Sequence, residues 1–207
     1  LADFVRRSGA SRPVIESMIL TGAFDCLHPD VNRRDLLLHF SDLQKSAVAV
    51  VSGAQMNLSF APPELTSSGL PAMSSAESVK YEVDRLGIDM SRHLIEFYGA
   101  FLNSIGAVRS SDLLKQRSQS SVLVAGVKVA MQTPPVRSGK RVIFLTLDDG
   151  YGCSDSTFFT DVQGEYANVL YSTSLLLVRG VTRRTGARGI SIRATGVWDL
   201  RAAYESW

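Results

Sequence analysis

Asp148 and Asp149 form the one adjacent acidic pair in the sequence, and paired carboxylates are the residue type that binds metal ions or transfers protons. The pair directly precedes Gly150 at the end of an apolar run, and Asp and Gly supply the backbone angles of a β-turn. We therefore interpret the pair as a turn and expect no metal site and no cofactor. The sequence also contains no nucleophile motif and no glycine-rich phosphate-binding loop, so we expect no catalytic residue in this segment.

Clustered basic residues interspersed with aromatic residues indicate a different chemistry, the binding of nucleic acid. The net charge of +2 says little by itself, but arginines and lysines gather locally in the second half of the chain. Cationic side chains neutralise phosphates, and exposed rings stack on bases. The candidate DNA-binding residues there are Arg137, Lys140, Arg141, Phe144, Phe158, Arg179, Arg183, Arg184 and Arg188.

These residues belong to a stretch that the pattern predicts to be a small β-barrel. Strands are expected over 122–131, 141–152, 154–159, 174–184 and 188–198, with a helix between the third and the fourth. This order is that of an OB-fold, which binds ligands on strands two and three between the loops joining strands 1–2 and 4–5. Both of these loops are basic here.

The aromatic residues of the barrel have two interpretations. Phe158 and Phe159 are adjacent, so on a regular strand one of them points outward, where it offers a stacking surface. Phe144 either stacks on a base or packs against the helical region.

Residues 1–44 are predicted to be helical, with short helices joined by turns that contain glycine. Such a helix-hairpin-helix region presents backbone N–H groups to a phosphate at its turn. Plain core packing explains the same apolar spacing equally well. The candidate DNA-binding residues of this region are Arg6, Arg7, Arg12, Gly22, Arg33 and Arg34.

Residues 45–75 are rich in Ala, Ser, Gly and Pro and are predicted to be a linker. Within them, Gln55, Leu58 and Phe60 have the form of a linear motif that docks into a partner's groove; the alternative is that the apolar residues cover the body of this protein. Residues 76–118 are predicted to be a helical connector. Its histidine, His93, has no cluster of other ligands around it and is expected to have a structural or capping role.

The composition is that of an ordinary globular chain of 207 residues, 45% of them hydrophobic. No apolar run approaches the roughly 20 residues that span a bilayer, and no secretory pattern precedes Arg6, so we expect no membrane association and a cytoplasmic location. Cys26 and Cys153 lack metal-ligand spacing and suggest a reducing compartment. The chain begins without methionine, so we expect it to be cut from a longer protein.

Three blocks of sequence carry a resemblance to a known family. The first block is ADFVRRSG at 2–9, followed by LTGAFDCL and NRRDLLL within 20–38. The second is EVDRLGI at 82–88, which leads to SRH at 91–93. The third consists of VLVAGVKV, FLTLDDGYG and LLLVRGVTRR in the predicted barrel. Together they resemble the C-terminal part of bacterial C-family DNA polymerases, comprising the DNA polymerase III alpha subunit and its error-prone relative. ADFVRRSG is closer to the error-prone branch.

The resemblance implies a helix-hairpin-helix module and an OB domain that hold template DNA beside a polymerase core. It also implies that Gln55, Leu58 and Phe60, in a Gln-x-x-Leu-x-Phe pattern, bind the sliding clamp, and that the family's catalytic carboxylates lie upstream of this segment. Two departures stand out. Leu94 replaces the proline of the family's Ser-x-His-Pro, and 151–159 is more polar than usual.

The sequence thus predicts an α+β chain with a helix-hairpin-helix region at 1–44, a linker at 45–75, a helical connector at 76–118 and, at 119–207, a five-stranded OB-fold domain with a C-terminal tail. The expected function is non-catalytic binding of single-stranded or primer-template DNA in a polymerase active in replication, DNA repair or translesion synthesis. The alternatives are a protein-interaction module that recruits the sliding clamp or mutagenesis proteins, and an RNA-binding barrel.

Overall fold

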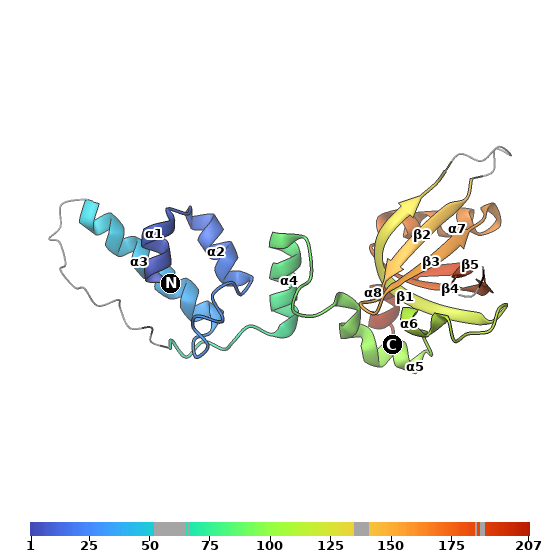
Figure 1. Cartoon of the computed structure of the whole chain (residues 1–207), viewed down its shortest axis with the longest axis horizontal. Helices are drawn as coiled ribbons and strands as arrows, with labels where there is room; N and C mark the ends of the chain where they lie inside the picture. The colour runs from blue at the N-terminus through green and yellow to red at the C-terminus, as the bar shows by residue number, and fades with distance from the viewer. Residues whose placement is uncertain (52–64, 66, 135–140, 185, 187–188) are drawn as a thin grey trace. The chain divides into compact units, whose positions relative to one another are not determined.

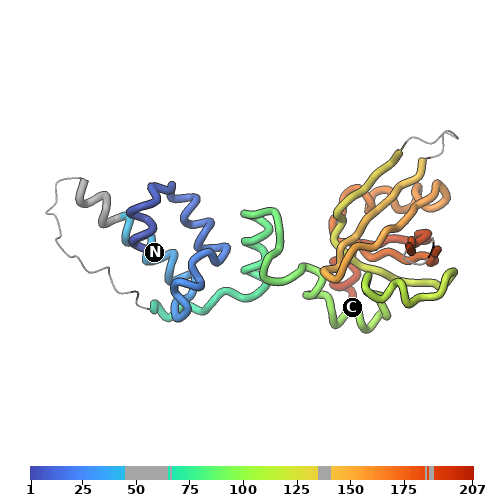
Figure 2. The backbone as a smooth tube through the Cα atoms, viewed as in Figure 1, coloured from blue at the N-terminus to red at the C-terminus, as the bar shows by residue number. Residues whose placement is uncertain are grey.

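The computed structural model describes the backbone of residues 1–51, 65, 67–134, 141–184, 186 and 189–207, and the side chains of the same residues except 45–51 (Figure 2). The predicted clamp-binding residues and part of the predicted DNA-binding set lie outside the described residues; these are Gln55, Leu58, Phe60, Arg137, Lys140 and Arg188. The chain forms two compact units, Leu1–Arg92 and His93–Trp207, which divide the predicted connector at 76–118 between them.

The first unit is helical, with helices α1 (Ala2–Ser8), α2 (Arg12–Leu20), α3 (Arg33–Val51) and α4 (Ser75–Leu86) (Figure 1). Its core contains buried aliphatic and aromatic side chains from α2, α3 and the turn between them: Ile15, Ile19, Phe24, Leu36 and Phe40. The predicted helical region is confirmed. The helix-hairpin-helix motif within it is not confirmed, since turns over residues 21–32 separate α2 from α3.

Glu82 is a buried carboxylate that fixes the end of this unit. Its Oε2 accepts hydrogen bonds from the backbone N–H groups of Met90, at 2.8 Å, and Ser91, at 2.9 Å. Burial raises the pKa of Glu82, but the hydrogen bonds from Ser91 and Met90 outweigh it, so that the pKa lies below the ordinary 4.5. Folding therefore favours the ionised form, and its contribution to stability is present above pH 4.5 and lost as the pH falls through the lowered pKa.

We expect Glu82→Gln to lower the free energy of unfolding of the helical unit by about 1–3 kcal/mol at neutral pH, because the amide accepts the two buried N–H groups less well. The difference from wild type should shrink as the pH falls from 4.5 through the lowered pKa of Glu82, where the wild-type carboxyl loses its charge. Urea unfolding followed by far-ultraviolet circular dichroism at several pH values measures this. Asp84→Asn, at an exposed position on α4, is the control. An equal loss at every pH would contradict the role of ionisation.

The second unit is built on a closed barrel of five strands. They are β1 (Ser121–Gln132), β2 (Ile143–Asp148), β3 (Cys153–Phe158), β4 (Leu175–Arg184) and β5 (Ile190–Asp199), in the order β1-β2-β3-β5-β4. β4 pairs with β1 to close the barrel, and β3 pairs with β5 in parallel. Helix α7 (Thr160–Ser172) connects β3 to β4 (Figure 1). This topology is that of the OB-fold, so the predicted fold class is confirmed.

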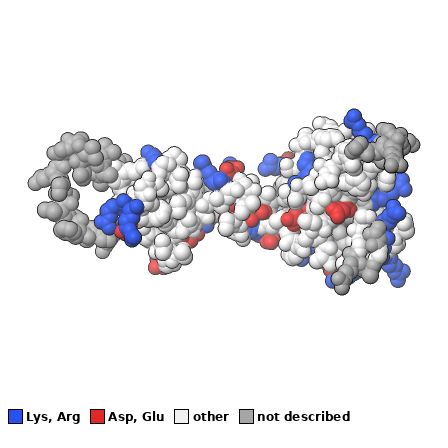
Figure 3. Space-filling model, turned by 45° about the horizontal axis from the view of Figure 1, so that its top comes forward, with Lys and Arg blue, Asp and Glu red and all other residues white. Residues whose placement is uncertain are grey.

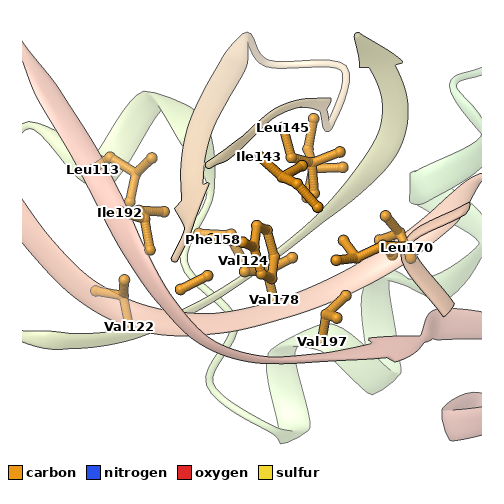
Figure 4. Close-up of a cluster of buried hydrophobic side chains, with 13 residues drawn as sticks. Leu113, Val122, Val124, Ile143, Leu145, Phe158, Leu170, Val178, Ile192 and Val197 are labelled. Atoms are coloured by element: carbon orange, nitrogen blue, oxygen red, sulfur yellow. The ribbon is translucent and has the colours of Figure 1, made fainter. Parts of the chain in front are cut away.

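The strands alternate between the barrel interior and its surface. Leu145, Ser156, Ile192 and Thr182 form one layer of neighbours around β2, β3, β5 and β4, and all are buried. Leu170 of α7 reaches the same core (Figure 4). Because the pleat has a period of two residues, every second residue of β2 and β3 points away from the core. The polar sequence of β3 is thereby accommodated, with Ser154 and Ser156 inside and Cys153 and Asp155 outside.

Helices cover the outer surface of β1 and β4. A 3-10 helix η1 (Leu94–Tyr98), α5 (Gly99–Ser104) and α8 (Leu200–Glu205) contribute to a second apolar cluster. Its buried members are Ile95, Phe101, Leu102, Ala125, Leu177 and Leu200. The clusters of buried residues leave the outer side chains of β2 and β3 uncovered, and this surface is where an OB-fold binds its ligands.

Asp148 and Asp149 lie at the turn between β2 and β3, as predicted. Asp148 Oδ1 accepts a hydrogen bond from the Gly150 N–H at 2.8 Å, and the buried Asp149 accepts from the N–H and the hydroxyl of Ser110, at 2.7 and 2.6 Å. Ser110 begins α6 (Ser110–Leu113), so Asp149 ties this helix to the barrel. Among the described residues, no group of three His, Cys, Asp or Glu is placed to hold a metal ion.

His93 caps η1, as predicted: its Nδ1 accepts a hydrogen bond from the Ile95 N–H at 3.2 Å.

Within the described part of the chain, no helix has the length and hydropathy needed to cross a membrane.

Candidate nucleic-acid interface

A groove of about 650 Å³ lies on the uncovered surface of β2, β3 and β5. Alternation along the strands places its residues at outward positions or next to the end of a strand, with the exception of Leu145, which belongs to the barrel core. The lining residues are Val142, Phe144, Leu145, Asp155, Thr157, Phe159, Arg183, Ser191 and Arg193. The groove therefore lies between the ends of the two loops that the OB-fold uses for binding, which follow β1 and β4.

Two exposed phenylalanines flank the groove. Phe144 on β2 is 46% exposed, and Phe159, which directly follows β3, is 38% exposed. Phe144 pairs with Thr157 across β2 and β3, and Thr157 pairs with Arg193 on β5, so these side chains form one row across the outer surface. An exposed ring on a strand offers its face to a planar ligand such as a nucleobase.

Two arginines supply positive charge at the same place. Arg183 is the penultimate residue of β4, Arg193 lies on β5, and both are exposed. The Arg193 guanidinium lies over the Phe159 ring at 5.4 Å from its centroid and 3.5 Å from the Asp161 carboxylate. A second groove of about 340 Å³ also includes Phe159, Arg183 and Arg193. Figure 3 shows Lys and Arg side chains gathered along one edge of the barrel unit.

The groove also contains a carboxylate. Asp155 on β3 is exposed, and its Oδ1 accepts a hydrogen bond from the Thr146 hydroxyl at 2.8 Å. Burial raises the pKa of the Cys153 thiol, and the charges of Asp148, Asp155 and Asp149 raise it further. The start of β3 is therefore acidic, whereas β4 and β5 supply arginines.

The structure brings together only part of the residues predicted for the barrel. Phe144 and Arg183 line the groove, and Arg141 is exposed close to it in sequence. The prediction of Phe158 as a contact is wrong, because its side chain is 0% exposed in the barrel core. Its neighbour Phe159 takes the outward position.

Two further predicted arginines have internal partners. Arg184 donates hydrogen bonds from Nη2 to the carbonyl oxygens of Leu114 and Gln116. The Arg179 guanidinium lies over the Trp198 ring, 5.5 Å from its centroid, and lines neither groove.

In the helical unit, the predicted basic residues are engaged with carboxylates. Arg6 and Arg7 pair with Asp3, and Arg12 pairs with Glu16, all at the surface.

Arg33 and Gly22, both predicted to contact DNA, have partners within the helical unit. The Arg33 side chain is 17% exposed and donates hydrogen bonds to Asp25 and to the Leu20 carbonyl oxygen. Gly22 has a φ of +85° and no room for a Cβ beside Arg33, and its N–H donates to the Ile19 carbonyl oxygen. Arg34 pairs with Glu77 at 2.8 Å.

Sequence reasoning missed Arg193 and chose the wrong member of the Phe158–Phe159 pair. A signal for Arg193 exists, because Ile190, Ile192 and Ala194 alternate around it and direct it outward. Phe159 carries no such signal, since it lies one residue beyond the end of its strand.

Bacterial DNA polymerases resemble this chain in sequence, although no family model matches it. The chain is 30% identical to the error-prone DNA polymerase of Symbiobacterium thermophilum over 225 residues, which cover 96% of the chain and 20% of the relative. It is 28% identical to DNA polymerase III subunit alpha of Escherichia coli K12 over 208 residues, which cover 95% of the chain and 18% of the relative. The chain thus spans about a fifth of the length of these relatives.

Two solved structures with a similar fold each match less than half of the chain. Asparaginyl-tRNA synthetase from Pyrococcus horikoshii matches 45% of it and 22% of its own chain, with 19% identity and a TM-score of 0.37. A mitochondrial single-stranded DNA binding protein from S. cerevisiae matches 41% of it and 96% of its own chain, with 14% identity and a TM-score of 0.33. Because these scores are low, the fold assignment depends on the strand order and register described above.

Proposed function

Because this chain belongs to the C-family of bacterial DNA polymerases and corresponds to their C-terminal region, we propose that it holds single-stranded template DNA in the barrel groove without catalysing a reaction. The observation that carries this proposal is the row of Phe144, Thr157 and Arg193 beside Phe159 and Arg183. Exposed rings next to arginines are the combination that binds single strands without strong sequence preference.

Single-stranded DNA suits this groove better than a duplex does. Stacking on Phe144 or Phe159 requires the face of a base, and in a duplex both faces are covered by neighbouring bases. Arg183 and Arg193 lie on adjacent strands at the groove and provide the charge that neutralises phosphates. One groove of the barrel would therefore provide both rings for the bases and arginines for the backbone.

The wider role follows from the family and is part of the proposal. The whole protein would be a DNA-directed DNA polymerase of the cytoplasm, acting in replication or, in the error-prone branch, in repair and translesion synthesis. Binding of a sliding clamp through Gln55, Leu58 and Phe60, binding of DNA by the helical unit and binding of mutagenesis proteins stay predictions.

Fluorescence anisotropy of a labelled thymine oligonucleotide, titrated with the chain, tests the proposal. We expect saturable binding at micromolar or lower concentrations that weakens steeply as salt is raised, because bound phosphates release counterions. A ribonucleotide strand of the same sequence distinguishes DNA from RNA. Absent or salt-insensitive binding would contradict the proposal and favour the alternative of a protein-interaction module.

Removing one groove arginine should lower the affinity for the single strand and should also make that affinity less dependent on salt. For Arg183→Gln and Arg193→Gln we expect the slope of log affinity against log salt to become shallower by about 0.7 each, the value for one phosphate contact on a single strand. Arg179→Gln is the matched control, since it removes the same charge from a side chain outside both grooves. If Arg179→Gln has the same effect as the groove variants, the strand does not follow the groove.

A further inference from the structure

We propose that the groove also distinguishes bases, with Asp155 favouring guanine over thymine in the bound strand; this inference rests on the proposed single-strand binding. A carboxylate in a groove that binds a polyanion is unfavourable if it faces phosphates, because like charges repel. It is favourable if it faces the hydrogen-bond donors of a base. The position of Asp155 lets its carboxylate face the hydrogen-bond donors of a base.

Asp155 lies beside the surface on which a base would stack. Phe144 pairs with Thr157, and Asp155 precedes Thr157 by two residues on the same face of β3. Asp155 is therefore a diagonal neighbour of Phe144, and diagonal side chains about 7–8 Å apart remain within reach of an aromatic ring. A base stacked on Phe144 would present its edge to the Asp155 carboxylate.

The carboxylate is held in place and retains free acceptor capacity. The Thr146 hydroxyl, directly across β2 and β3 from Asp155, donates to Oδ1 at 2.8 Å. An ionised carboxylate has about four lone-pair sites on its two oxygens, so one hydrogen bond leaves room for two more.

The charges of the groove orient a bound strand. Arg183 and Arg193 belong to β4 and β5, whereas Asp155 belongs to β3 and adds to the acidic surroundings of Cys153. Phosphates are attracted to the arginines and repelled by Asp155. The bases of the strand consequently extend over β2 and β3, toward the carboxylate.

Of the four bases, guanine matches a carboxylate best. An ionised carboxylate only accepts hydrogen bonds, and single-stranded bases present their Watson–Crick edges to a protein. Guanine has two adjacent donors there, N1–H and the N2 amine. Thymine has one donor, N3–H, between two carbonyl oxygens that repel the carboxylate. A bidentate contact is thus available to guanine alone.

The test compares binding of the whole chain to three labelled strands by fluorescence anisotropy. One contains only thymine, one has isolated guanines among thymines, and one has inosine, which lacks the N2 amine, at the same positions. We expect the guanine strand to bind roughly fivefold to a hundredfold more tightly than the thymine strand, as one bidentate contact provides, with inosine between them. In Asp155→Asn this preference should disappear, and binding of the thymine strand should become tighter because a repulsive charge is lost.

Asp112→Asn is the control, because it removes the same charge from α6, outside the groove, and should leave the preference unchanged. Equal affinity of wild type for the guanine and thymine strands would overturn the inference, as would a preference that survives in Asp155→Asn. Tight but equal binding of all strands would leave the proposed function in place. A failure to bind any strand would overturn both.

Discussion

Replacing Phe144 and Phe159 together by alanine is expected to weaken binding of a thymine oligonucleotide roughly a hundredfold, because stacking on each ring is worth about 1–3 kcal/mol. Both rings are exposed on the groove, and neither belongs to the cluster of buried residues in the barrel. Their loss should therefore change binding far more than stability. Anisotropy titration gives the affinity, and urea unfolding monitored by tryptophan fluorescence confirms that the barrel is intact, since both tryptophans, Trp198 and Trp207, belong to the barrel unit.

Two further variants separate stacking from general apolar contact. Phe144→Tyr retains an aromatic face and should bind nearly as wild type, whereas Phe144→Leu retains an apolar side chain without that face and should bind weakly. Tyr171→Ala is the matched control, because Tyr171 is an exposed aromatic residue at the end of α7 that lines neither groove. If Tyr171→Ala weakens binding as much as the groove variants, the bases do not stack in the groove.

Phe158→Ala is expected to lower the free energy of unfolding of the barrel by about 3–5 kcal/mol, the usual cost of a large cavity in a core. The ring is fully buried in the cluster that includes Val124 and Val178 (Figure 4), so its removal leaves a space that the closed barrel fills only in part. Urea unfolding followed by tryptophan fluorescence measures the loss.

Phe159→Ala provides the control for this prediction at the adjacent position. Its side chain faces the groove, so we expect a change in stability well under that of Phe158→Ala and a clear loss of oligonucleotide affinity. If Phe159→Ala destabilised the barrel more than Phe158→Ala does, Phe159 would be the inward residue and Phe158 the outward one. Phe158→Leu, which retains most of the volume, should recover much of the lost stability.

The exposed surface of the barrel is defined by what covers the rest of it. η1, α5 and α8 bury the apolar outward side chains of Ala125 on β1 and Leu177 on β4. The outward positions of β2 and β3 instead include Phe144, Thr146, Asp155 and Thr157, and the groove that three of them line contains no residue of a described helix. The same closed sheet therefore has one face that binds helices and one that is available for a ligand.

The sequence by itself determined the class of fold. The β-branched run over 122–131, alternation over 143–148 and 154–159, and turn residues at Asp149-Gly150 indicate strands with a helix after the third, because period-two patterning and turn chemistry are local properties. It also determined the cap formed by His93, which depends on neighbours in the chain. Only the tertiary structure decided which aromatic and basic side chains meet.

Phe158 and Phe159 are indistinguishable in type, and the end of β3 places one in the core and the other on the groove. Arg33 is as basic as Arg193, yet its side chain is largely buried against Asp25, which lies eight residues earlier in the chain, whereas Arg193 stays exposed. Arg193 and Phe144 come together only because β3 pairs with both β2 and β5. Strand pairing and ion pairing across turns are nonlocal, so the binding surface could not be derived from residue types and spacing alone.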